Sequence, residues 1–123
     1  MTPERALTDV NLSEIQFTPS TSDVVLDFLN MSDGNNTGTL VCRGVIAFLY
    51  HAPVDVSLPV YIGQVDIARL SGDDADTLLK RLGRDSWDGE EALSGEIDYV
   101  RAEGWCVVEI ACLAAKVVQR TDR

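Results

Sequence analysis

Apolar residues in this chain form short runs that are separated by clusters of turn-forming residues. The longest run covers residues 39–50 and is rich in β-branched and aromatic side chains. Such a run, bounded by glycine, asparagine and proline, is typical of a buried β-strand. Because both its odd and its even positions are largely apolar, the run predicts the central strand of an antiparallel sheet, partly covered on both faces.

Further runs predict the other strands of the sheet. Alternating or β-branched apolar positions indicate strands over residues 12–18, 23–31 and 58–70, and a short strand over 96–101. Residues 104–119 would accept a strand or a helix, and the valines at both ends of this segment favour the strand. Residues 1–9 are polar and are predicted to be a loose lead-in.

A hairpin loop is predicted over residues 32–37, where Gly34, Asn35 and Asn36 all tolerate a positive φ angle. If Ser32 and Gly38 flank this loop symmetrically, paired residue numbers sum to about 70. Asp27 would then face Arg43 as a structural ion pair. The same register places on one face of the sheet Leu26, Phe28, Leu40, Cys42, Ile46 and Phe48.

One helix is predicted over residues 71–82. Ser71 is a good capping residue, the aspartates that follow suit the positive end of the helix dipole, and Gly83 can end the helix. The apolar stripe of this helix consists of Ala75, Leu78, Leu79 and Leu82. The predicted fold is therefore α+β: a single domain over residues 1–123, with five or six antiparallel strands in meander order and one helix packed on one face of the sheet.

The charge balance narrows the classes of partner. The chain has 123 residues and a net charge of −10, from 20 acidic and 10 basic residues. Nucleic-acid binding needs clustered lysine and arginine, and anionic membranes attract basic segments, so we predict neither a nucleic-acid partner nor a membrane partner. The acidity instead fits a basic protein partner, and it also keeps a small domain in solution.

The three cysteines are Cys42, Cys106 and Cys112, each inside an apolar run. Buried, reduced thiols are expected in the cytosol, and no signal peptide or membrane span is evident, so a cytoplasmic location is predicted. The spacing of the cysteines does not match a zinc site, and no glycine-rich phosphate loop is present. The sequence predicts no metal and no cofactor.

Residues 85–103 carry seven acidic residues and one basic residue, a net charge of −6, together with aromatic side chains. Aromatic anchors among carboxylates are typical of a protein-binding surface. The candidate binding residues are Trp87, Asp88, Glu90, Glu91, Asp98 and Tyr99. The alternative is a solvated loop whose aromatic rings fold back onto the core.

These patterns favour a small acidic protein-binding module without enzymatic activity, such as an immunity-type inhibitor of a basic protein. A first alternative is a small-molecule binder or an enzyme whose site lies near His51, the only histidine, and Arg43. A second alternative is a subunit of a homo-oligomer, such as a homodimer.

Overall fold

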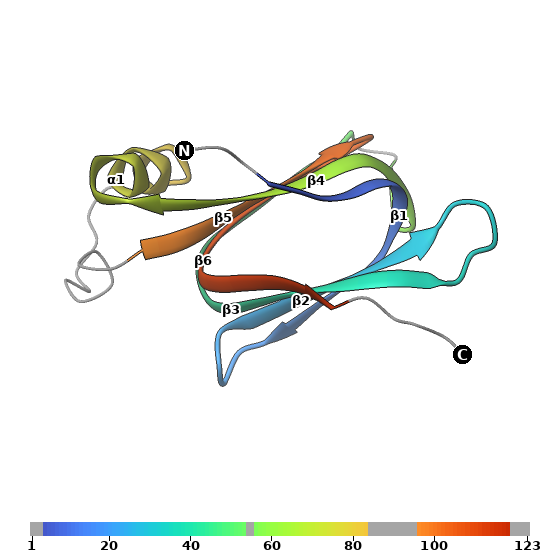
Figure 1. Ribbon diagram of the computed structural model, residues 1–123, viewed down its shortest axis with the longest axis horizontal. Helices are drawn as coiled ribbons and strands as arrows, with labels where there is room; N and C mark the ends of the chain where they lie inside the picture. Colours follow the sequence, from blue (N-terminus) through green and yellow to red (C-terminus); the bar gives the residue numbers. More distant parts are fainter. Residues whose placement is uncertain (1–3, 54–55, 84–95, 119–123) are drawn as a thin grey trace.

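The computed structural model describes residues 4–53, 56–83 and 96–118. In this part of the chain there are six strands and one helix (Figure 1). In chain order they are β1 (Glu4–Thr18), β2 (Asp23–Asn30), β3 (Asn36–His51), β4 (Val60–Ser71), α1 (Gly72–Arg81), β5 (Glu96–Gly104) and β6 (Val107–Val118). The predicted antiparallel sheet with a single helix is confirmed for these residues.

The strands form a closed barrel in the order β1-β2-β3-β6-β5-β4, and all neighbours are antiparallel. The predicted meander order is therefore wrong beyond β3. The chain leaves β3, crosses to β4 beside β1, and returns through β5 to β6, which pairs along most of β3. Closure gives every strand two neighbours, although the second half of β3 pairs only with β6 and the end of β6 pairs only with β3.

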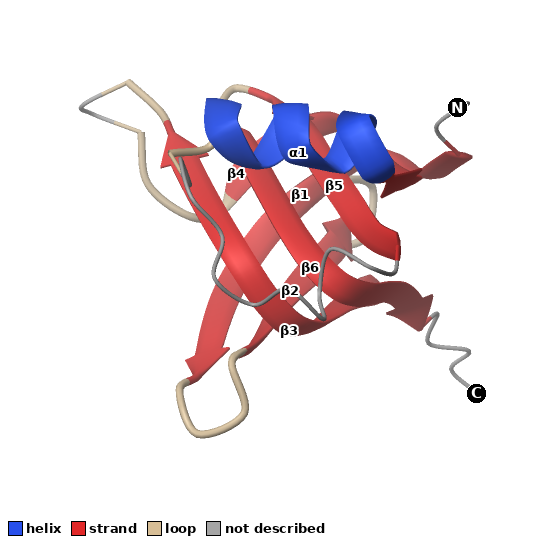
Figure 2. Cartoon of the chain, turned by 90° about the vertical axis from the view of Figure 1, so that its left-hand side faces the viewer, coloured by secondary structure: helices blue, strands red, loops and turns tan. Residues whose placement is uncertain are grey.

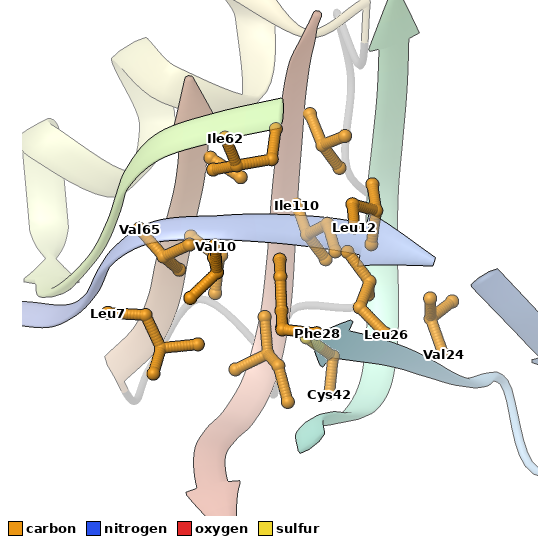
Figure 3. Packing of buried hydrophobic residues seen from close by; sticks show 14 of the residues in the cluster. Leu7, Val10, Leu12, Val24, Leu26, Phe28, Cys42, Ile62, Val65 and Ile110 are labelled. Atoms are coloured by element: carbon orange, nitrogen blue, oxygen red, sulfur yellow. The ribbon is translucent and has the colours of Figure 1, made fainter. Parts of the chain in front are cut away.

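The barrel interior is filled by apolar side chains from all six strands. Phe28, Leu12, Leu26 and Ile110 have no exposed surface and point towards one another (Figure 3). Burial of such a side chain stabilises a fold by about 1.5–3 kcal/mol relative to leaving it exposed. For the described residues, the interior of the barrel is thus a packed apolar core.

A bulge in β3 changes which residues face the core. The pairing with β6 shifts between Val45 and Ala47, and the preceding Gly44 has a φ angle of 64°. Ile46 therefore joins a cluster on the outside of the barrel instead of the core face that the alternation predicted. Val45 packs against the interior. The alternation rule fails here because a bulge inserts one extra residue into the strand.

The register of the β2–β3 hairpin differs from the prediction by four residues. Asp27 faces Thr39 and accepts a hydrogen bond from its hydroxyl at 2.9 Å, so Asp27 and Arg43 do not form the predicted ion pair. Arg43 lies 3.6 Å from Asp23 instead. The loop closes earlier than expected, because the Asn30 N–H donates to the Asn35 carbonyl at 2.7 Å. A shift by an even number leaves the inward and outward positions of both strands unchanged.

Two further predictions change and one is confirmed. β1 begins at Glu4, so residues 4–9 are strand where a loose lead-in was expected. This stretch pairs with β4, a long-range contact that local sequence does not reveal. Ser71 occupies the capping position of α1, but its side chain makes no capping hydrogen bond. The ambiguous segment near the C-terminus is the strand β6, as its valines indicated.

Helix α1 lies against the outside of the barrel, beside β4 and β5 (Figures 1 and 2). Its buried residues Ala75, Leu78 and Leu79 form a second apolar cluster with outward-facing strand residues. The strand residues of this cluster are Ile46, Ala47, Ile97 and Ala111. The β3 bulge therefore contributes directly to helix packing, because it turns two consecutive residues towards α1.

Candidate functional site

A groove runs between α1 and the outer surface of β4 and β5, with a volume of about 530 Å³. Its apolar part comes from Ala68, Leu70 and Leu78, while Tyr99 and Arg81 supply polar groups. The helix contributes Asp74 and Thr77, both exposed. The groove therefore combines apolar surface with polar and charged groups from the helix and from β5.

A cluster of polar side chains ties α1 to the barrel beside this groove. The Glu109 carboxylate on β6 is only 4% exposed, although it lies on the outer face of the strand. It accepts a hydrogen bond from the Arg81 guanidinium at 2.5 Å and another from the Tyr99 hydroxyl at 2.5 Å. Arg101 lies 3.6 Å away on the neighbouring strand. A buried carboxylate requires such partners, because an unpaired buried charge is strongly destabilising.

These contacts determine the protonation states within the cluster. The hydrogen bond from Arg81 holds the pKa of Glu109 below its usual value. Burial, together with the hydrogen bond to Glu109, raises the pKa of Tyr99 above its usual value. A general acid or base works best with a pKa near the working pH, and both shifts point away from neutrality. The cluster therefore has the properties of a structural anchor.

The first half of α1 carries exposed negative charge. Asp73, Asp74 and Asp76 are exposed, and no ion pair joins them to another residue of the described ranges. The arginines of the barrel, in contrast, all face carboxylates: Arg5, Arg43, Arg69 and Arg101. The aspartates favour the helix through its dipole, and one of them, Asp74, brings unpaired negative charge to the groove.

The structure separates the two β5 residues that the sequence placed in one binding surface. Asp98 is 4% exposed, and its carboxylate accepts two hydrogen bonds from Arg69, at 2.8 and 3.0 Å. It also accepts one from the Ala115 N–H at 2.8 Å. Asp98 is thus engaged within the barrel wall, whereas Tyr99 lies in the groove. The candidate residues Trp87, Asp88, Glu90 and Glu91 lie outside the described residues.

The alternative site near His51 and Arg43 is not assembled. Both residues are on β3, but His51 pairs with Val107 and Arg43 pairs with Ala114. Seven residues of extended β6 separate these partners, a distance of roughly 23 Å at about 3.3 Å per residue. Arg43 and His51 are therefore too far apart to bind one small molecule.

Sequence reasoning did not find the Arg81–Tyr99–Glu109 cluster. The signal that could have found it is Glu109 itself, the one acidic residue inside the apolar stretch of β6. An acid at such a position predicts a buried charge that needs a cation. The partner, however, comes from the last turn of α1, and only the three-dimensional fold brings Arg81 to β6.

No group of three or more potential metal ligands occurs in the described part of the chain. The described helix, α1, has ten residues. No helix within the described ranges has the length and apolar character that crossing a membrane requires.

Comparison with known proteins places the chain in a family. A model of the family described as "-like:-like" matches residues 5–118. The chain belongs to this family. The crystal structure of an uncharacterized protein from Neisseria gonorrhoeae is similar, with a TM-score of 0.66 and 14% sequence identity. The match covers 95% of this chain and 97% of the other, and at this identity it shows a shared fold. No curated protein matches the chain.

Proposed function

We propose that this chain is a non-enzymatic protein-binding module that docks a basic segment of another protein in the groove beside α1. The observation that carries the proposal is the groove itself, which combines apolar surface from Ala68, Leu70 and Leu78 with an aspartate on its helical side. Apolar surface supplies affinity on binding, while charge mainly determines association rate and choice of partner.

The distribution of ion pairs supports a basic partner. The chain carries a net charge of −10, and the aspartates of α1 are not neutralised by other described residues. Arg81, which also contacts the groove, is already held by Glu109 and Tyr99. A lysine or arginine from a partner would therefore meet uncompensated carboxylates at the helix, whereas an acidic segment would be repelled.

The proposal retains part of the surface that the sequence indicated. Tyr99 belongs to the acidic segment 85–103 and contributes to the groove. Trp87 and its acidic neighbours remain proposed contributors. The most specific form of the proposal is an immunity-type inhibitor that neutralises a basic protein, because that role needs charge and affinity without a catalytic site. A cytoplasmic location remains part of the proposal.

The proposal can be tested by affinity capture with two matched pairs of substitutions. Asp74→Asn with Asp76→Asn removes two charges from α1, and Glu14→Gln with Asp33→Asn removes two charges from exposed positions elsewhere. We expect the wild type and the control pair to retain the same basic protein and the α1 pair to lose most of it. Equal recovery on all three proteins would overturn the docking site, and capture of acidic proteins alone would overturn the class of partner.

A further inference from the structure

A second pocket lies at the end of the barrel formed by the β1–β2 turn and the β3 bulge, with a volume of about 270 Å³. Its walls include Phe17, Pro19, Val24 and Val45, and polar atoms form little of its surface. In Figure 1, α1 lies at the top and the blue β1–β2 turn lies at the bottom, and the pocket shares no lining residue with the groove beside α1. The pocket is therefore separate from the groove beside α1.

Hydrogen bonds between the turn and the bulge hold the walls of this pocket in place. The Val45 N–H donates to the Ser22 carbonyl at 2.7 Å, and the Gly44 N–H donates to the Asp23 carboxylate at 3.2 Å. Ser22 has a φ angle of 59°, a left-handed conformation that is uncommon for a residue other than glycine. The backbone is thus fixed on two sides, and a ligand would meet a preformed site.

An exposed aromatic ring forms one wall. Phe17 is 58% exposed, yet it packs edge-to-face on Phe48 with ring centroids 5.1 Å apart. Phe48 in turn packs against the barrel core. The Phe17 ring therefore has a defined position while much of its apolar surface stays in contact with water. Covering this surface would be favourable, because burying apolar area is the main driving force for association.

The chemistry of the lining determines the class of ligand. Asp23 is the one charged residue among the lining residues, and its carboxylate is engaged by the Gly44 N–H and lies 3.6 Å from Arg43. A charged ligand would lose hydration in this pocket without gaining a free partner of opposite charge. The volume is below the roughly 300–1,000 Å³ of pockets that hold drug-sized molecules.

We propose that this pocket binds a small, neutral, ring-shaped apolar molecule of about the size of indole. The Phe17 ring would stack on or meet the edge of the ligand ring, and Pro19 and Val45 would supply further apolar contacts, whereas Val24, only 2% exposed, would contribute little surface. This inference rests on the pocket at the β1–β2 turn alone and does not depend on the function proposed for the groove beside α1.

Indole can serve as the neutral probe, with indole-3-acetate and tryptamine as anionic and cationic analogues. In a titration followed by amide NMR signals, indole should shift the signals of Val24 and Val45 and leave those of α1 unchanged. Its affinity should exceed that of either charged analogue at least fivefold. Absence of binding, binding of the charged analogues with equal affinity, or shifts centred on α1 would overturn the proposal.

Two substitutions and one control locate the site. Thr18→Phe fills the pocket from an exposed position, and Phe17→Ala removes one wall. Both should weaken indole binding at least fivefold, while Val118→Ala, an exposed apolar position on β6, should leave it unchanged. Thermal unfolding of each variant shows whether it is folded at the temperature of the titration. Unchanged affinity in folded Thr18→Phe and Phe17→Ala proteins would contradict the assignment.

Discussion

Replacing Glu109 with glutamine tests whether the polar cluster anchors α1 to the barrel. The substitution keeps the size of the side chain but removes the charge that Arg81 and Tyr99 share. A hydrogen bond to a charged group contributes about 1.5–3 kcal/mol. The Arg81 side chain is 51% exposed and can form hydrogen bonds with water when the charge is removed. The contribution of the Arg81–Glu109 hydrogen bond to stability is therefore at the lower end of this range. We therefore expect a loss of about 2 kcal/mol in the free energy of unfolding.

The assay is urea unfolding at neutral pH, supported by thermal unfolding. For a domain of this size, 2 kcal/mol corresponds to a decrease in Tm of roughly 6–10 °C. Glu103→Gln is the matched control, because Glu103 is about half exposed and lies 3.4 Å from Arg101. That exposed pair should contribute less than about 0.5 kcal/mol. Equal effects of the two substitutions would refute the reasoning.

A double-mutant cycle and the pH dependence make the test specific to the cluster. Tyr99→Phe combined with Glu109→Gln should show a coupling energy of about 0.5–1.5 kcal/mol, since the two residues share a hydrogen bond.

Because the pKa of Glu109 is lowered in the folded state, the contribution of its carboxylate to stability is present above the unfolded pKa of about 4.3. This contribution is lost as the pH falls through the lower folded value, so the wild type and Glu109→Gln should converge in strong acid.

Three further outcomes can be measured on the same protein. Gly44→Ala should lower the free energy of unfolding by at least about 1 kcal/mol, because the residue has a positive φ angle and an added Cβ would lie 2.8 Å from Leu113; an unchanged urea midpoint would contradict the bulge. Ser71→Ala should lower the free energy of unfolding by less than about 0.5 kcal/mol, measured by urea unfolding, since the hydroxyl makes no capping hydrogen bond. Thiol reagents should label the native protein slowly, and rapid labelling would show that the core is open at Cys42, Cys106 or Cys112.

Local pattern was sufficient to predict the elements but not their arrangement. The runs of β-branched residues placed strands close to β2, β3, β4 and β6, and the apolar stripe with its aspartates placed α1. The barrel depends on pairings between β1 and β4 and between β3 and β6, which join residues far apart in the chain. Several strand orders are compatible with the same pattern of alternation. The sequence alone therefore could not distinguish a meander sheet from a closed barrel.

Details of turn and bulge geometry account for the other differences. The β2–β3 loop closes with a hydrogen bond between Asn30 and Asn35. Because several glycine and asparagine residues in this stretch tolerate turn conformations, the sequence did not show at which of them the loop closes. Gly44 within an apolar run could have indicated the bulge, because an isolated glycine in a strand often marks one. The groove and the Glu109 cluster could not be predicted, since each combines side chains from α1 with side chains from separate strands.

The association rate of a captured basic partner, measured as a function of ionic strength, tests the proposed docking site most directly. Charge on α1 should accelerate encounter, and salt should weaken this effect because screening acts over about 10 Å at 0.1 M. We predict that Asp74→Asn with Asp76→Asn slows association and flattens its salt dependence far more than Glu14→Gln with Asp33→Asn. Identical rates and salt dependences for the two pairs would contradict docking at α1 and leave only a general effect of net charge.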